Sequence, residues 1–178
     1  GDGFEAVVDL FTPQKMEIES ASVKGNAQVA VLTPGKAPVA AGVLNVSARH
    51  TLSPLSLTKV SFNISEEGAA LLDKVYVYNA SGSLKLGSAE VKGGTFTVTL
   101  DKPFELADGE KSFAIKADAN LRAGGGNRVA FKLESITTSD AKETKASSQS
   151  AVIECMTETK AVATIGRQTI YLYNDWEF

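Results

Sequence analysis

Hydrophobic and polar residues alternate along most of this chain, in the pattern of β-strands that bury one face. In residues 60–64 the apolar side chains are Val60, Phe62 and Ile64, with polar residues between them. Successive side chains of a strand point to opposite faces, so this spacing directs the apolar set toward a core. The same alternation recurs in residues 44–48, 95–100, 113–117 and 129–133, and directs Phe96, Phe113 and Phe131 inward as well.

Turn-forming residues separate these runs at short intervals. Glycine or asparagine occurs in each of the segments 33–35, 66–68, 79–82, 92–94, 107–109 and 123–127. About ten short strands with such turns predict an all-β fold, an antiparallel two-sheet β-sandwich of the jelly-roll kind with little or no helix. Weaker strands are expected at 6–11, 15–19 and 28–32. Residues 139–148 are polar all round and are interpreted as a solvated loop.

One run breaks the alternation. In residues 55–60 the apolar side chains are Leu55 and Leu57, at odd positions, and then Val60, at an even one. A β-bulge, which inserts one extra residue into a strand, shifts the parity in this way without ending the strand. The sequence therefore predicts a bulge between Leu57 and Val60.

The length and charge of the chain limit the classes of protein to which it can belong. Its 178 residues, 43% of them hydrophobic, suit one globular domain, which we expect to cover residues 1–165, with residues 166–178 as a strand or linker toward a following domain. The net charge of −3 and the scattered lysines do not suit binding to nucleic acid. No run approaches the roughly 18 apolar residues of a membrane span.

The sequence offers few groups for catalysis or metal binding. It contains one histidine, His50, and one cysteine, Cys155. A nucleophile needs a base that is held by a third group, and a zinc site needs several histidines or cysteines, so neither is expected. Cys155 lies in an alternating run and is interpreted as a half-buried small hydrophobic residue of a strand. Calcium needs only oxygen ligands, and Asp118 and Asn120 are weak candidates for a structural calcium site, the alternative being solvated polar turn residues.

Two groups of aromatic residues are candidates for binding. Tyr76 and Tyr78 fall on one face of the strand expected at residues 72–78, where they either form an exposed pair that stacks on sugar or cover a second layer of core. The C-terminal tail contains a second aromatic group, expected to dock on this domain or on a following one, with ligand stacking as the alternative. Its members are Tyr171, Tyr173, Trp176 and Phe178.

Residues 38–140 resemble a known family in the order of their strands and turns. The matching segments are 43–46, 55–62, 73–78, 104–113, 117–119 and 123–127, among them the strand Asp-Lys-Val-Tyr-Val-Tyr and the turn Ala-Asp-Gly. This order is similar to that of the N-terminal domain associated with BNR-repeat neuraminidases, the bacterial sialidases. The propeller marks of the catalytic domain, Arg-Ile-Pro and the Ser-x-Asp-x-Gly-x-Thr-Trp box, do not occur in this sequence.

The resemblance implies a role beside an enzyme. The parent protein would be a secreted, periplasmic or surface-attached glycoside hydrolase of the exo-α-sialidase type, with its catalytic domain C-terminal to this chain. The chain itself would be a non-catalytic accessory module, either a weak binder of sialylated or other host glycans or a spacer and docking platform. The alternative is a structural or adhesive β-sandwich protein of the bacterial surface.

Overall fold

The computed structural model describes residues 17–49, 54–158, 160–165 and 168–173, and for the last two segments only the backbone. The one helix among the described residues is the short α2 (Glu66–Ala69), capped by the Ser65 side chain. The main body otherwise consists of strands, which are, in chain order, β1 (Glu17–Gly25), β2 (Ala30–Leu32), β3 (Val39–Arg49), β4 (Leu55–Ile64), β5 (Leu72–Asn79), β6 (Lys85–Glu90), β7 (Gly94–Leu106), β8 (Gly109–Ala119), β9 (Arg128–Thr138), β10 (Glu143–Lys145) and β11 (Val152–Thr157).

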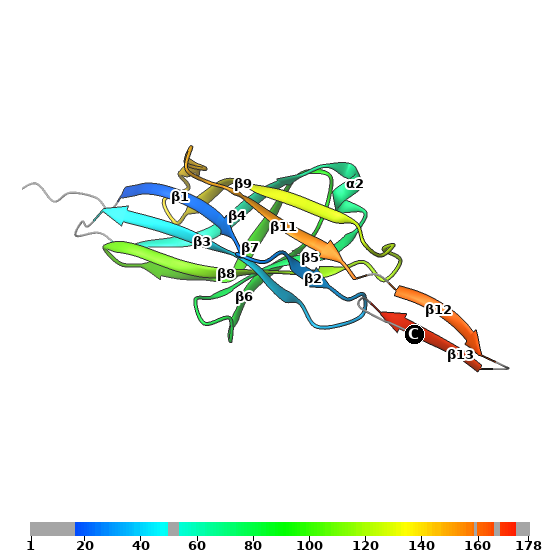
Figure 1. The fold of residues 1–178 in the computed structure, drawn as a ribbon. Helices are drawn as coiled ribbons and strands as arrows, with labels where there is room; N and C mark the ends of the chain where they lie inside the picture. The colour runs from blue at the N-terminus through cyan, green and yellow to red at the C-terminus, as the bar shows by residue number, and fades with distance from the viewer. Residues whose placement is uncertain (1–16, 50–53, 159, 166–167, 174–178) are drawn as a thin grey trace, which may run out of the picture.

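These eleven strands form one continuous hydrogen-bonded sheet. The order is β1-β3-β8-β5-β6-β7-β4-β9-β11-β2, with β10 paired to β9. All neighbours are antiparallel except β11 and β2, which run parallel. The sheet curls over on itself, so that its two ends meet on one side of an elongated body (Figure 1). The all-β, largely antiparallel prediction is confirmed, but the expected division into two separate sheets is not found among the described residues.

The pairing of β6 with β7 joins the two halves of the sheet, β1-β3-β8-β5-β6 and β7-β4-β9-β11-β2. Only two residue pairs connect these strands, Gly87 with Leu100 and Ser88 with Thr99. A Cβ at Gly87 would lie 2.7 Å from the Thr99 carbonyl oxygen, so glycine is needed for this close approach. Alternation predicts which side chains face the core but not which strands are bonded to each other. The short pairing of β6 with β7 is therefore not predictable from the alternation.

The interior of the curled sheet is filled by the residues that the alternation directs inward. Phe62 stacks on Phe96 with ring centroids 5.7 Å apart and meets the ring of Phe131 edge-on at 5.5 Å. Phe113 is fully buried and contacts Phe104 edge to face at 4.9 Å. Burial of each such side chain contributes about 1.5–3 kcal/mol, so these rings are a main source of the stability of the body.

The predicted bulge in β4 is confirmed. The pairings of β4 with β7 and with β9 both shift register between Leu57 and Lys59. Leu55, Leu57 and Val60 are all buried despite the change of parity. The extra residue therefore keeps both halves of the strand facing the same core.

The weaker predictions have mixed outcomes. The segment interpreted as a solvated loop contains β10, which pairs with residues 135–137 of β9, so a loop throughout 139–148 is wrong. The strand expected at 28–32 is the shorter β2, and the one expected at 15–19 corresponds to the start of β1 at Glu17. The strand expected at 6–11 lies outside the described residues.

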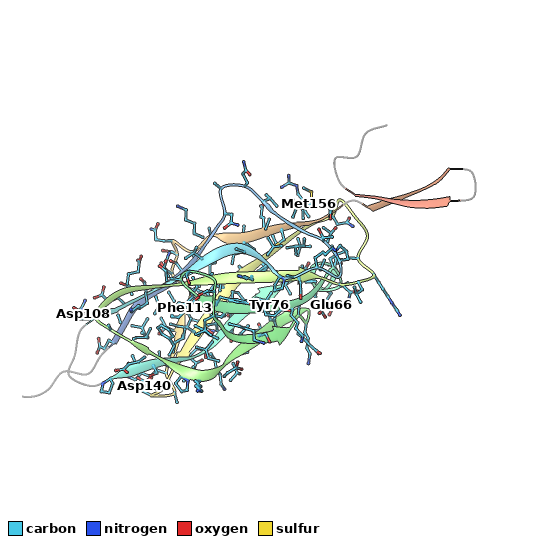
Figure 2. All side chains as sticks on the ribbon, turned by 90° about the horizontal axis from the view of Figure 1, so that it is seen from below. Glu66, Tyr76, Asp108, Phe113, Asp140 and Met156 are labelled. Atoms are coloured by element: carbon cyan, nitrogen blue, oxygen red, sulfur yellow. The ribbon has the colours of Figure 1, made fainter. Side chains whose placement is uncertain are left out.

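A second, two-stranded sheet follows the body. It is the hairpin of β12 (Lys160–Ile165) and β13 (Gln168–Tyr173), which pair antiparallel with each other. It extends from the end of the body at which β11 ends (Figures 1 and 2). The division into residues 1–165 and 166–178 stays a prediction. Within the described residues, no helix has the length and apolarity needed to cross a membrane.

Candidate functional site

A pair of tyrosines lies on the outer face of β5, opposite the core. Val75 and Val77 of this strand are fully buried, whereas Tyr76 and Tyr78, which alternate with them, are half-buried. The two tyrosine rings have centroids 6.2 Å apart and are inclined by 54°. Tyr76 and Tyr78 therefore share one face, as the alternation predicts, and they face outward.

Asp118 of the neighbouring strand β8 fixes Tyr76 in place. The Tyr76 hydroxyl donates to Asp118 Oδ2 at 2.5 Å, and the backbone N–H of Lys74 donates to Asp118 Oδ1 at 2.8 Å. Partial burial of the phenol, and then its hydrogen bond to the Asp118 carboxylate, raise the pKa of Tyr76 well above its usual range. Tyr76 therefore remains a protonated hydrogen-bond donor at physiological pH.

Lys116, also on β8, holds Tyr78. Its Nζ lies 4.1 Å from the centroid of the Tyr78 ring, a cation–π contact, and donates to the Gly82 carbonyl oxygen at 2.8 Å. Gly82 belongs to the turn between β5 and β6, which Asn79 organises by accepting hydrogen bonds at Oδ1 from the N–H groups of Ser83 and Leu84. The ring, the ammonium group and the turn therefore form one connected unit.

The calcium candidates are both engaged with the protein. Both carboxylate oxygens of Asp118 accept the hydrogen bonds described above. Asn120 lies in the turn after β8, where its Oδ1 accepts from the Arg122 N–H at 2.9 Å. No group of three or more histidine, cysteine or acidic residues gathers as a metal site in the part of the chain that the structure describes. Calcium binding by these two residues stays a prediction.

The other residues singled out by the sequence lie elsewhere. Cys155 is fully buried in β11, and burial raises the pKa of its thiol to about 12. It is therefore a protonated core residue at neutral pH. Tyr171 and Tyr173 belong to β13, whose side chains lie outside the described residues. The same holds for His50, Trp176 and Phe178, so the docking role of the C-terminal aromatic residues stays a prediction.

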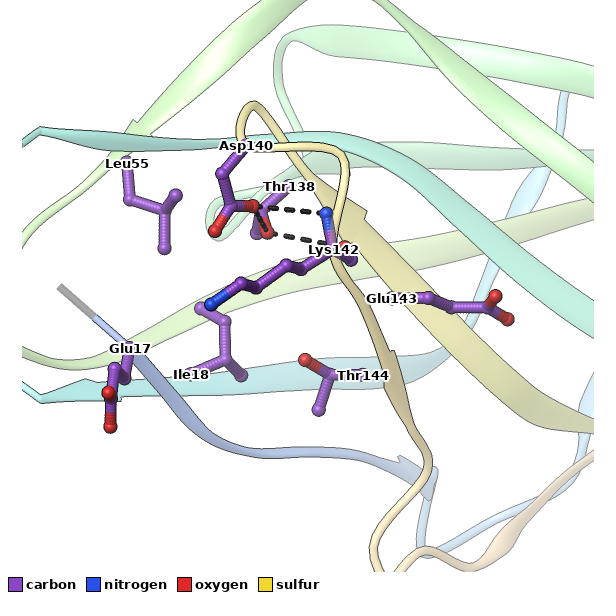
Figure 3. A pocket seen from close by; sticks show the side chains of 8 residues that line it. All are labelled: Glu17, Ile18, Leu55, Thr138, Asp140, Lys142, Glu143 and Thr144. Atoms are coloured by element: carbon purple, nitrogen blue, oxygen red, sulfur yellow. Dashed lines mark hydrogen bonds between the residues drawn. The ribbon is translucent and has the colours of Figure 1, made fainter. Parts of the chain in front are cut away.

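A polar cleft at one end of the body was not expected from the sequence (Figure 3). Asp140 Oδ1 accepts from the Thr138 hydroxyl at 2.7 Å and from the Lys142 N–H at 3.2 Å, which holds the pKa of its carboxyl group below the usual range. These bonds close the turn between β9 and β10, in which Ala141 has a φ of 65°. The cleft has a volume of about 220 Å3 and is lined by Glu17, Ile18, Leu55, Thr138, Asp140, Lys142, Glu143 and Thr144.

Comparisons with known proteins give weak similarities only. No family model matches the chain. No curated protein matches it either. Among solved structures it is similar to a cohesin module of a family 33 glycoside hydrolase from Clostridium perfringens, with a TM-score of 0.39 and 11% identity over 79% of this chain and 96% of that chain.

Two further structures show a comparable degree of similarity. The sixth cohesin of scaffoldin B from Acetivibrio cellulolyticus, in complex with a mutant dockerin, has a TM-score of 0.38 and 14% identity over 78% of this chain and 98% of that chain. The major pilin subunit of Bacillus cereus has a TM-score of 0.36 and 13% identity over 92% of this chain and 54% of that chain.

Proposed function

We propose that this chain is a non-catalytic accessory module of a sialidase-type glycoside hydrolase that acts outside the cytoplasm. In this proposal the outer face of β5 and β8, formed by Tyr76, Tyr78, Lys116 and Asp118, is the recognition face, which we name the tyrosine face. The observation that carries the proposal is the outward tyrosine pair, which is fixed by bonds from β8. The resemblance of residues 38–140 to the domain associated with BNR-repeat neuraminidases supplies the class of enzyme.

The geometry of the face favours weak binding of a glycan. Aromatic rings bind sugars by stacking on them, and rings held rigidly lose little conformational entropy when they do so. Because the two rings are inclined by 54°, one sugar ring can stack on only one of them at a time. Such a face suits successive sugars of a chain better than a single enclosed sugar.

Charge on the face favours acidic sugars. The Lys116 ammonium group lies beside the Tyr78 ring and uses one of its hydrogens for the Gly82 carbonyl. Its remaining donors and its charge can meet a carboxylate, such as that of a sialylated glycan. A spacer or docking role, in which the same face contacts the neighbouring catalytic domain, is the other form of the proposal.

A glycan-array experiment tests the proposal and separates its two forms. The full chain is screened on mucin glycans before and after removal of sialic acid, with calcium or with EDTA. We expect weak binding that is lost in the Tyr76→Ala/Tyr78→Ala double variant. We also expect Lys116→Gln to weaken binding to the sialylated glycans more than binding to the desialylated ones, because only the former present a carboxylate.

Leu121→Ala is the matched control. Leu121 is 78% exposed in the turn after β8, so its truncation removes apolar surface without touching the tyrosine face. Its binding should equal that of the unmodified chain. Absence of binding to every glycan would rule out the carbohydrate-binding form, and equal loss in Leu121→Ala would rule out the tyrosine face.

A further inference from the structure

We infer that this module is built to bear tension between the segments that flank it. The inference rests on the proposed accessory role as a spacer, and it arises from a different part of the molecule. Strand β2 pairs parallel with the last strand of the body, β11. Strand β1 lies beside the chain that leads into β11 and runs in the same direction, since Ala21 is bonded to Ser147 and Val23 to Ala151. The chain enters at one end of the body and leaves at the other (Figure 1).

The N-terminal segment changes partners along its length. As β1 it pairs with β3 as far as Gly25, and as β2 it pairs with β11 through residues 30–32. A Cβ at Gly25 would lie 3.1 Å from the Val152 carbonyl oxygen, so the segment passes very close to the start of β11. At Gly42 of β3 a Cβ would lie 2.7 Å from the Lys24 carbonyl oxygen and 3.0 Å from Ile153 Cγ1. These glycines bring β1, β3 and β11 together.

Hydrogen bonds tie β1 to the chain that leads into β11. The N–H of Ser147 donates to the Ala21 carbonyl at 2.8 Å, and the N–H of Ala151 donates to the Val23 carbonyl at 2.9 Å. The Val23 N–H in turn donates to Ser150 Oγ at 2.9 Å. This edge of β1 is therefore covered by backbone from the opposite end of the sequence.

A second set of bonds secures the exit of β11. The Thr157 hydroxyl, which is buried, donates to the Gly124 carbonyl at 2.6 Å, and the Gly126 N–H donates to the Thr157 carbonyl at 2.8 Å. One residue further on, the Glu158 N–H donates to the Leu32 carbonyl at 2.8 Å, and the Thr33 hydroxyl donates to the Glu158 carboxylate. The end of β11 is thus bonded both to the turn before β9 and to β2.

This arrangement loads the bonds in shear. A force that pulls the start of β1 and the end of β11 apart acts along both strands, whereas the bonds between them point across. Bonds crossed by a shear force share the load and must fail together. A force that peels two strands apart breaks their bonds one after another. We give one name, the β1/β2–β11 junction, to the contacts that join residues 21–33 to residues 147–158, together with those of Thr157 to the turn before β9.

Single-molecule force spectroscopy on the full chain tests the inference. With handles at the two chain ends, the junction is loaded in shear. With one handle at the N-terminal end and the other at Glu143→Cys, an exposed position that lines the same cleft as Glu17 at the start of β1, the two segments are peeled from one end. Native Cys155 is buried and does not compete for the handle. We expect the folded lifetime at equal force to be about a hundredfold shorter in the peeling geometry, since its bonds fail singly.

Two matched variants locate the resistance. Ser150→Ala removes a half-buried hydrogen bond in the junction, and Ser112→Ala removes a similar bond, from Ser112 Oγ to Asn45 Oδ1 at 2.7 Å, outside it. Under end-to-end load Ser150→Ala should shorten the lifetime about tenfold and Ser112→Ala by less than about threefold. Equal lifetimes in the two pulling geometries, or equal effects of the two variants, would overturn the inference. Glycan binding by Ser150→Ala is measured in parallel and should be unchanged, so failure of the recognition face is distinguishable from failure of the junction.

Discussion

The tyrosine face and the β1/β2–β11 junction are held together by different kinds of contact. The face depends on side chains, with Asp118 and Lys116 of one strand fixing Tyr76 and Tyr78 of the next. The junction depends mainly on backbone groups and on glycines that let strands approach closely. Side chains can be exchanged at a surface with little effect on the fold, whereas a close backbone approach tolerates almost no change. The face can therefore be varied for a new ligand while the junction keeps the body intact.

The largest expected effect comes from filling the close approach in the junction. Gly42→Ala places a Cβ against the Lys24 carbonyl oxygen and Ile153, so we expect a loss of about 1–3 kcal/mol in the free energy of unfolding, measured by urea denaturation. Ala40→Ser is the control, since it adds one heavy atom at an exposed position of the same strand. A loss in Gly42→Ala no larger than in Ala40→Ser would show that the junction is not tightly packed.

A smaller loss in the free energy of unfolding is expected when the hydrogen-bond acceptor Asp118 is removed from the tyrosine face. Asp118→Ala deprives the Lys74 N–H and the Tyr76 hydroxyl of their partner, which should cost about 1–2 kcal/mol. Asp118→Asn retains one acceptor oxygen and should lose less. The two variants are compared by urea denaturation, and equal losses would mean that the hydrogen bonds to Asp118 contribute little to stability.

The pH dependence of stability tests the raised pKa of Tyr76. Its folded-state pKa lies above the unfolded value of about 10, so its contribution is fully present below that pH and is lost as the pH rises toward the folded-state pKa. We expect the unmodified chain to lose stability more steeply above pH about 10 than Tyr76→Phe, which cannot ionise at this position. Thermal denaturation across that range measures the difference, and parallel curves would contradict the assignment.

The smallest expected effect is the loss of the cation–π contact. Lys116→Met keeps the alkyl chain but removes the charge over Tyr78, which should cost about 0.5–1 kcal/mol at low ionic strength. Lys85→Met, on the exposed start of β6, is a control for a general effect of net charge. If the two variants lose the same stability, the contact with the Tyr78 ring has no specific role.

The sequence predicts which face of each strand is buried far better than it predicts which strands lie next to each other. The inward positions of Phe62, Phe96, Phe113 and Phe131 follow from alternation alone, as does the bulge after Leu57. That Tyr76 and Tyr78 share one face follows from the same rule, whereas alternation leaves open whether this face is exposed or covers a second layer of core. These features are local, because they depend on residues close together in the chain.

The features that the sequence does not predict depend on residues far apart in the chain. The continuity of the sheet through Gly87 and the switch of the N-terminal segment from β3 to β11 both depend on strand order, which alternation does not encode. The side-chain type of Asp118 makes it a calcium candidate, and only the register of β8 against β5 brings it to the Tyr76 hydroxyl. The glycines at positions 25, 42 and 87 were the available signal, since glycine within a strand often marks a close backbone approach.

Burial of Cys155 gives this protein an internal reporter of its own opening. The thiol is sealed in β11, directly opposite Val129 on one side and Ala30 on the other. A thiol reagent can reach it only when these strands separate, so the alkylation rate in native buffer measures how often they do. Because the chain has a single cysteine, that rate belongs to one position and needs no engineered label. The alkylation rate of Cys155 thus measures local unfolding at the place where β2 and β11 pair.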